Sequence, residues 1–440
     1  MFRIVLMLFL LIDLTLANSL VERGKIALER KKYEDAALLF DRAIKLEPNN
    51  AEAYLNRGNV FYYQGEFERS EKDYFKAIEL GGKTALAYFN LGNLYEKFGD
   101  LQKALEHHTK AIETDPKYTD SYINRGLIYS NIGKNEEAIN DYTQALKINQ
   151  NLSLAYNNRG NIYSELKIYD KALSDLNQAI KIAPSFTIAY RNRGEIYRKM
   201  GEYDKALKDY DKAVKLVPSF TVVYCNRAQI YIDMGKKEKA LRDYERVISY
   251  DHDKECAYLG RANFYKTLGE YQNAADDYAK LIKIRGEKAS SNLYTNLAFS
   301  LDKLNRYEEA IKVYEKALEA EGNETTLIYY NIAVAYGKMN DYKKAISFYD
   351  KLIEEDALNV QGYFNRGFAY WTFDDFPHAI ADFTKAIELD PNYLSAYINR
   401  GGVYFQAGEP KKASQDAKKA CELGDCRSLE YLKNRGALVE

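Results

Sequence analysis

The sequence repeats itself along nearly its whole length. A unit of 34 residues, clearest between Thr187 and Phe220, recurs throughout the 440-residue chain. Such a period is typical of arrays in which each unit buries its apolar surface against its neighbours. We expect twelve units, which start at Ala17, Ala51, Ala85, Thr119, Ser153, Thr187, Thr221, Glu255, Ser291, Thr326, Val360 and Leu394.

Three extra residues interrupt the spacing of the units. Ala289 and Ser290 precede the ninth unit, and Thr325 precedes the tenth. Insertions are tolerated in the turns between repeated elements. We therefore predict a bend that separates a block of eight units from a block of four, and not a domain boundary.

Each unit is predicted to be a pair of helices. Residues at i, i+4 and i+7 form one face in each half, namely Tyr190, Gly194 and Tyr197, and then Ala206, Tyr210 and Ala213. Gly201 follows the first face, where a helix can end in a left-handed conformation, and Pro218 stops the second. Because Gly194 and Ala206 are small, the two helices can approach closely.

The order of these residues carries a family resemblance. An aromatic residue, a small residue four positions later, and then Tyr, Ala, an aromatic, Ala and Pro at these offsets resemble the tetratricopeptide repeat. The resemblance implies an all-α fold, a right-handed superhelical solenoid of about twelve helical hairpins. It also implies that the first helices line a concave groove that receives proteins or peptides.

The first residues differ in character from the rest of the chain. Arg3 precedes an apolar run, and Thr15, Leu16 and Ala17 offer a small-x-small cleavage site. We interpret residues 1–17 as a secretory signal peptide, which predicts a periplasmic or secreted protein and no membrane segment after cleavage. Two alternatives are an uncleaved anchor, disfavoured by the short run and by Asp13, and an apolar capping helix of a cytosolic solenoid.

The remainder is then an array over residues 18–427 and a C-terminal cap over residues 428–440. Terminal repeats of such arrays need a cover for their last apolar groove. Leu429, Leu432 and Leu438 are spaced to provide it.

Two positions of the repeat vary together along the array. Nine first helices carry Arg immediately before the small residue, and eight of these units carry Asp sixteen residues later. The exception is the first unit, with Arg23 and Leu39. Units with Leu91, Leu297 or Ile332 in the Arg position lack the Asp. We therefore predict ion pairs within the repeats, which replace an apolar contact and fix the hairpin. The pairs are Arg57 with Asp73, Arg125 with Asp141, Arg159 with Asp175, Arg193 with Asp209, Arg227 with Asp243, Arg261 with Asp277, Arg366 with Asp382, and Arg400 with Asp416.

The four cysteines are too few for a disulfide framework in a chain of this length. Cys421 and Cys426 flank the end of the last helix, and Cys225 and Cys256 begin successive first helices. The sequence leaves open whether either pair is bridged or all four are free buried thiols.

No constellation of residues predicts catalysis, so we expect no enzyme, no cofactor and no metal site. The four histidines lie outside the known zinc and haem patterns, and phosphate-loop and nucleophile-elbow motifs are absent from the sequence. The formal charge of −1 gives no reason to expect a nucleic-acid partner.

An aromatic stripe beside the core face marks a predicted docking surface near the C-terminus. In the eleventh unit it consists of Phe364, Phe368 and Trp371, again at i, i+4 and i+7. Tyr330 and Phe405 continue it in the neighbouring units. An exposed apolar patch usually marks an interaction surface, although the cap or a second copy of the protein can also cover it.

The corresponding stripe differs elsewhere in the array. Near the N-terminus Leu55, Tyr62, Tyr63 and Phe89 form a smaller predicted apolar area. In the sixth unit Arg191 and Arg198 surround an acidic residue, which predicts either a site for a carboxylate or a solvated charged face.

Asparagine recurs at one position of the first helices, from Asn56 and Asn90 through to Asn399. Its amides can bond either a peptide backbone or the neighbouring helices. Family members that grip chaperone tails use lysines on these helices, and Leu55 and Phe89 stand at the first lysine position here. Such a partner is therefore not expected.

We interpret the chain as an exported scaffold that binds proteins or extended peptides, in a role such as cell-envelope assembly or secretion. The alternatives are a solenoid that binds a glycan or another small molecule, with Trp371 as a stacking platform, and a structural protein that assembles with itself.

Overall fold

The structure is a computed structural model that describes residues 2–322 and 324–437, with side chains from residue 15 onward. Every regular element in these residues is a helix, and the predicted array of twelve hairpins is confirmed. The first helices of the hairpins are α1 (Phe2–Glu29), α3 (Ala51–Gln64), α5 (Thr84–Lys97), α7 (Thr119–Asn131), α9 (Ser153–Glu165), α11 (Thr187–Lys199), α13 (Thr221–Asp233), α15 (Glu255–Thr267), α17 (Ser291–Lys303), α19 (Thr325–Lys338), α21 (Val360–Trp371) and α23 (Leu394–Gln406).

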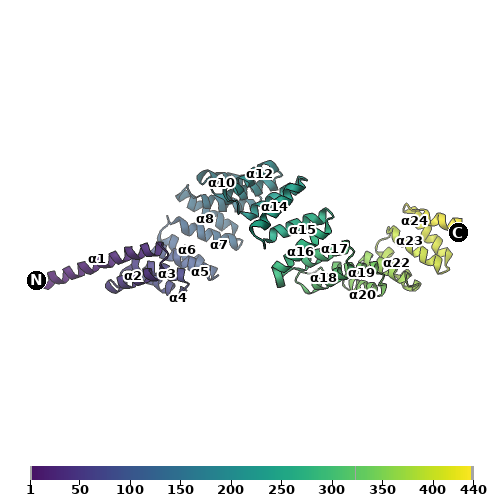
Figure 1. The fold of residues 1–440 in the computed structure, drawn as a ribbon, viewed down its shortest axis with the longest axis horizontal. Helices are drawn as coiled ribbons and strands as arrows, with labels where there is room; N and C mark the ends of the chain where they lie inside the picture. The colour runs from purple at the N-terminus through teal and green to yellow at the C-terminus, as the bar shows by residue number, and fades with distance from the viewer. Residues whose placement is uncertain (1, 323, 438–440) are drawn as a thin grey trace. The chain divides into compact units, whose positions relative to one another are not determined.

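Each first helix packs against the second helix that follows it, and successive hairpins stack in chain order within each part of the chain (Figure 1). The second helices are α2 (Tyr33–Leu46), α4 (Phe67–Glu79), α6 (Leu101–Thr114), α8 (Asn135–Ile148), α10 (Tyr169–Ile182), α12 (Tyr203–Leu216), α14 (Lys237–Tyr250), α16 (Tyr271–Arg285), α18 (Tyr307–Glu319), α20 (Tyr342–Glu355), α22 (Phe376–Leu389) and α24 (Pro410–Glu422).

Helix α1 begins at Phe2, well before the predicted start of the first unit at Ala17. The expected junction between signal peptide and repeat therefore lies inside one continuous helix. At the other end α25 (Arg427–Asn434) occupies the place of the predicted cap, with Leu432 buried and Leu429 packed beside it. Leu438 lies outside the described residues.

The chain divides into two compact units, Met1–Phe220 and Thr221–Glu440. This division after the sixth hairpin differs from the expected separation of eight hairpins from four. The chain is not divided at the insertion, because a short 3₁₀ helix, η1 (Gly286–Lys288), accommodates the extra residues and Ala289 is buried. The apolar cluster around Ala289 extends from Tyr258 to Ala335, so the core continues through the insertion.

The hairpins are built around the position where the first helix has a small residue. A Cβ atom on Gly58 would lie 2.7 Å from Cε1 of Tyr74, and a Cβ atom on Gly194 would lie at the same distance from Cε1 of Tyr210. The second-helix ring therefore occupies the space that a side chain would need. Gly201 adopts the predicted left-handed conformation, with φ of 75°, in the turn between the helices.

All eight predicted ion pairs are present in the structure. Each arginine donates from Nε and Nη2 to the two carboxylate oxygens of its aspartate, at distances of 2.6–2.9 Å. The aspartates are at most 6% exposed. These are therefore bidentate pairs with buried carboxylates, a stronger arrangement than an exposed ion pair.

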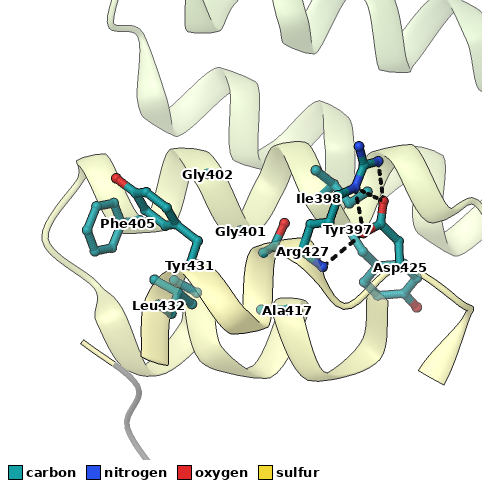
Figure 2. Close-up of a pocket in the computed structure, with 12 residues that line it drawn as sticks. Tyr397, Ile398, Gly401, Gly402, Phe405, Ala417, Asp425, Arg427, Tyr431 and Leu432 are labelled. Carbon is teal, nitrogen blue, oxygen red and sulfur yellow. Dashed lines mark hydrogen bonds and ion pairs between the residues drawn. The ribbon is translucent and has the colours of Figure 1, made fainter. Parts of the chain in front are cut away.

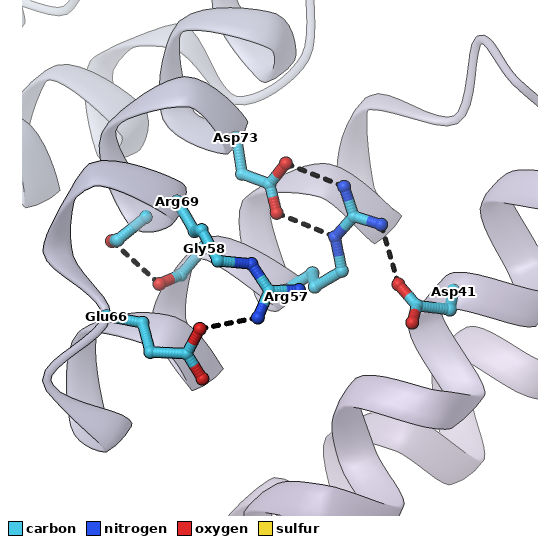
Figure 3. Close-up of polar contacts among 7 residues, drawn as sticks. Asp41, Arg57, Gly58, Glu66, Arg69 and Asp73 are labelled. Carbon is cyan, nitrogen blue, oxygen red and sulfur yellow. Dashed lines mark hydrogen bonds and ion pairs between the residues drawn. The ribbon is translucent and has the colours of Figure 1, made fainter.

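The arginines also reach beyond their own repeat, whereas we predicted ion pairs only within the repeats. Figure 3 shows Arg57 bound to Asp73 of its own hairpin and, through Nη1, to Asp41 of the preceding hairpin at 2.6 Å. Arg125 and Arg159 make the same backward contact to a threonine, each at 2.9 Å. In each case the partner is the residue sixteen positions before the arginine.

Removing one of these arginines should destabilise its hairpin. We expect Arg193→Ala to reduce local stability by about 3 kcal/mol, because Asp209 would remain buried without its partner. The measurement is native-state hydrogen exchange in α11 and α12, since a repeat array need not unfold in one step.

The matched control is Arg193→Leu combined with Asp209→Val, because the ninth hairpin has Leu297 and Val313 at these positions. The double variant should recover most of the lost protection. Unchanged exchange in Arg193→Ala would show that the ion pair contributes nothing to stability.

Candidate functional site

A wide cavity of the first unit lies on the face formed by α3, α5 and α7. Its volume is about 760 Å³, which is within the usual range for ligand sites. We call it the Asn–Tyr groove. Its lining consists of Asn59, Tyr62, Tyr63, Tyr74, Phe89, Asn90, Asn93, Glu96, Lys97 and Asn124.

Hydrogen bonds between successive first helices hold the asparagines of the groove. Nδ2 of Asn90 donates to Oδ1 of Asn59 at 2.8 Å, and Nδ2 of Asn124 donates to Oδ1 of Asn93 at 2.7 Å. The hydroxyl of Tyr74, which comes from a second helix, also donates to Oδ1 of Asn59, at 2.9 Å. The amides are thus fixed in orientation before any ligand binds.

Aromatic side chains form the other wall of the groove. The rings of Tyr62 and Tyr63 meet edge to face, with centroids 5.6 Å apart, and the ammonium of Lys97 lies 5.0 Å from the centre of the Tyr62 ring. Tyr63 is 61% exposed and stacks on Tyr33. Tyr63 therefore offers an accessible face that is already held in place.

The predicted member Leu55 does not belong to this surface. It is only 3% exposed and packs with Tyr74, Ala77 and Leu91 in the core. The prediction that Leu55 contacts a ligand is therefore wrong. The Leu55 side chain instead fills the space between its own hairpin and the next one.

Two buried histidines stand behind the groove. His107 and His108 take the places that Asp and Tyr occupy in most other hairpins. The His108 ring contacts Phe89 of the groove at a centroid distance of 5.6 Å, and neither ring nitrogen has a hydrogen-bond partner in the described residues. His107 stacks on Tyr95. Burial, helped by the positive charge of Arg125, lowers the pKa of His108 to about 4.

This hairpin should lose stability in mild acid. An unfolded histidine has a pKa near 6.5, so the contribution of a neutral buried His108 is complete above pH 6.5 and is lost as the pH falls towards 4. The loss amounts to about 3 kcal/mol for His108. Hydrogen exchange in α5 and α6 between pH 7 and pH 4 measures it.

The control is His108→Tyr, which restores the residue found at this position as Tyr142 and Tyr210. This variant should keep most of its protection at pH 4. Equal acid sensitivity of the two proteins would assign the effect to other groups.

A smaller polar cavity of about 340 Å³ lies further along the same unit, between α7, α9 and α11. We call it the Arg191 cavity, and its lining includes Tyr142, Asn157, Asn158, Glu165 and Arg191. The other predicted cation, Arg198, makes a bidentate bond to Glu195 at 2.7 and 3.0 Å. Of the two predicted arginines, Arg191 is thus the one that lines a cavity.

The predicted aromatic patch of the second unit is largely internal packing. Phe364 lies between Phe383 and Tyr393, with ring centroids 5.6 and 5.0 Å away. Tyr330 rests near Tyr349, with centroids 6.5 Å apart. These side chains stabilise their own and neighbouring hairpins and leave little surface for a ligand.

The rest of the patch is also partly covered. Trp371 packs over Gly402, where a Cβ atom would lie 3.0 Å from its Cη2, and its Nε1 donates to Gln406 at 2.6 Å. The cap residue Tyr431 covers Phe405, as the sequence analysis had allowed. Phe368 keeps 43% of its surface exposed, so one anchor remains in place of the expected continuous patch.

Beside the cap lies a pocket of about 420 Å³ that the sequence analysis missed (Figure 2). Tyr397, Phe405 and Tyr431 form its aromatic sides, and the ion pair between Asp425 and Arg427 stands at its edge. Its lining comes from α23, from α24 and from the cap helix α25 with the segment before it. The pocket therefore depends on how the cap packs, which the spacing within one helix does not reveal.

The cysteines are joined in two pairs. Cys225 bonds to Cys256, with Cα atoms 6.3 Å apart, and Cys421 bonds to Cys426, with Cα atoms 4.0 Å apart. The first pair links two successive first helices, α13 and α15. Of the alternatives that the sequence left open, the structure has both bridges.

Within the described part of the chain, no cluster of acidic, histidine or cysteine side chains is arranged to hold a metal ion. A search of the same residues for a helix with the length and apolar character of a membrane span found none.

The tetratricopeptide repeat profiles match most of the sequence. They cover residues 24–65, 49–117, 119–152, 153–186, 187–220, 222–254, 253–321, 327–357 and 360–393. The chain belongs to the tetratricopeptide repeat family. Members of this family are generally scaffolds without catalytic activity.

Several solved structures are similar to parts of the chain. A tetratricopeptide repeat protein from Parabacteroides merdae is 22% identical, with a TM-score of 0.42, and the match covers 65% of this chain and 99% of that one. YrrB, described as a protein with an unusual peptide-binding site, is 26% identical, with a TM-score of 0.36 over 42% of this chain and 95% of its own. At these TM-scores the similarities carry no argument about function. No protein with a curated description matches the sequence.

Proposed function

We propose that this protein is an exported scaffold that binds an extended segment of another protein along the first-helix face of its N-terminal unit. The Asn–Tyr groove is the observation that carries the proposal. It joins polar groups that donate and accept hydrogen bonds with exposed aromatic faces, in a cavity of about 760 Å³.

The chemistry of the groove suits an extended polypeptide. A strand-like segment presents N–H and C=O groups along both edges, and an amide side chain can satisfy either kind. Asn59 and Asn90, on two successive first helices, are oriented by the bond between them, and Asn93 is oriented by its bond from Asn124. A ligand therefore does not have to order them, which reduces the entropic cost of binding.

The aromatic wall supplies the expected anchor. Tyr63 is exposed on one face and supported on the other by Tyr33, so that an apolar side chain can stack on it without displacing the core. Aromatic residues in such positions often dominate the free energy of binding. The ends of the segment would continue along the first helices beyond the groove.

Two observations support export. The sequence begins with a signal-peptide pattern, and the four cysteines are joined in pairs, which persist in oxidising compartments. Cleavage after Ala17 would also leave the core residues Leu20, Val21 and Ala27 in the mature chain. The partner is accordingly expected among exported proteins, in a role such as envelope assembly or secretion.

The expected mature N-terminus is Asn18. Expression of the full sequence in a host with a secretion pathway, followed by N-terminal sequencing of the exported protein, checks this expectation. Recovery of the chain in the cytosol with residues 1–17 intact would contradict the proposal of export and would leave the proposal of peptide binding to its own test.

Binding should depend on the groove and not on exposed aromatics in general. We propose to screen a bead-displayed library of short unstructured peptides against the full chain and to measure the selected peptides by fluorescence anisotropy. Tyr63→Ser should weaken binding about tenfold, because an anchor is lost.

Phe98→Ser is the matched control, since Phe98 is 56% exposed at the end of the next first helix and does not line the groove. It should bind like the wild type. If no peptide binds the full chain, or if the two variants lose equal affinity, the groove is not the binding site. A loss specific to Phe368→Ser would place the site on the second unit.

A further inference from the structure

We infer that the Asn–Tyr groove accepts a basic side chain of the bound segment, whose cationic head pairs with the carboxylate of Glu96. The inference rests on the proposed function and adds a chemical class to its ligand. It comes from a partly buried carboxylate on α5 that lines the groove and has no counterion among the described residues.

The carboxylate of Glu96 is withdrawn from water without compensation. The residue lies 34 positions after Tyr62, so it occupies on α5 the place that Tyr62 occupies on α3. The described residues provide neither a hydrogen-bond donor nor an ion-pair partner for its side chain. Burial raises the pKa of Glu96, and no neighbouring charge opposes that shift. A carboxylate in this state favours a cationic ligand.

The sequence explains why Glu96 lacks a counterion. One other hairpin, the ninth, has an acidic residue at this position, and its Asp302 pairs with Lys338 of the following hairpin at 2.6 Å. In the hairpin that follows Glu96, the position of Lys338 is taken by Asn131. Because Asn131 is neutral, the ion pair that joins the ninth and tenth hairpins cannot form at Glu96.

Lys97, which also lines the groove, does not neutralise Glu96. The two are adjacent in α5, and adjacent residues of a helix do not face each other. The Lys97 ammonium instead lies 5.0 Å from the centre of the Tyr62 ring and 5.3 Å from that of Phe67. Aromatic rings therefore hold the cation of the lining, and the anion remains to be paired by a ligand.

The aromatic wall suits the rest of a basic side chain. Burial, together with the neighbouring Tyr63 and Glu96, raises the pKa of Tyr62, so the phenol and the carboxylate are close enough to interact. The methylene stem of a lysine or arginine can lie along the exposed face of Tyr63 while its head reaches Glu96. The faces of the rings also attract a cation directly.

An oriented amide supplies a second acceptor beside the carboxylate. Asn93 also lines the groove and stands three residues before Glu96, on the same side of α5. Its Oδ1 accepts from Asn124 at 2.7 Å, which fixes the amide. An amide oxygen has two lone pairs and can accept a further bond from an ammonium or guanidinium group. Glu96 thus provides the charge, and Asn93 adds direction.

The direct test follows the side-chain carboxylate resonance of Glu96 in the full chain labelled with ¹³C-glutamate, which is identified by its loss in Glu96→Gln. We expect it to move when Nα-acetyl-lysine amide or Nα-acetyl-arginine amide is added. The neutral Nα-acetyl-citrulline amide, which resembles the arginine compound in shape, should leave it unmoved. A response to one of the two cations alone would tell which head group the site accepts.

The peptides selected with the full chain give the second readout. We expect them to be enriched in lysine or arginine. Replacing that basic residue by glutamine should weaken binding about tenfold, and so should Glu96→Gln. The two changes together should weaken binding no further than either one alone, because they remove the same interaction.

Two further variants separate the site from a general attraction of positive peptides. Glu113→Gln removes the same charge from an exposed position of α6, in the same hairpin, and should leave the affinity unchanged. Asn131→Lys supplies the counterion that Lys338 gives to Asp302, so it should reduce the affinity for basic peptides without altering Glu96. Asn131 is exposed at the end of α7, where a longer side chain does not disturb the core. Equal losses in Glu96→Gln and Glu113→Gln would overturn the inference.

The two proposals can fail separately. Peptides that bind through Tyr63 without any preference for basic residues, together with a Glu96 resonance that neither cation moves, would overturn the cation site and leave the scaffold function standing. A resonance that moves although no peptide binds would overturn the proposed function and leave a site for small cations.

Discussion

The structure depends on a close contact at the point where most first helices have glycine and the others have alanine. The ring of the second helix fills that space, as Tyr74 does beside Gly58 and Tyr210 does beside Gly194. This contact sets the distance between the two helices and so the shape of the surface that each hairpin offers to its neighbours. It also carries the tyrosine hydroxyl through the hairpin to the face of the first helices. Core packing and the chemistry of the groove are therefore set by the same residues.

The hydrogen bonds of the arginines link each hairpin to the preceding one. Arg57 binds Asp73 within its hairpin and Asp41 in the preceding one, and its guanidinium lies over the rings of Tyr54 and Phe61. A planar group with five donors can join three helices in this way, which a lysine cannot do. Because Asp73 is buried, its bond constrains the two helices of the hairpin more strongly than an exposed pair would, whereas Asp41, which links the preceding hairpin, is half exposed.

Most of the fold could be predicted from the sequence because the repeat encodes local rules. Helix spacing, the left-handed Gly201 and the pairing of Arg193 with Asp209 all follow from one unit. The binding surface could be predicted only in part. Tyr63 is exposed as expected, but Phe364 is held by Phe383 and Tyr393, and Phe405 is covered by the cap. Whether an aromatic stripe is exposed depends on residues of neighbouring hairpins, which the spacing within one helix does not reveal.

The character of the groove is decided by the residue that follows the small position. The incoming tyrosine hydroxyl meets Asn59 in the second hairpin and Glu195 in the sixth, and each accepts its hydrogen bond. In the fourth hairpin it meets Leu127, and the hydroxyl of Tyr142 is left without a partner. The ring nevertheless stays beside the small residue, since a Cβ atom on Gly126 would lie 3.1 Å from Cε1 of Tyr142. The array can thus vary its binding chemistry along the groove while the contact that maintains the fold stays constant.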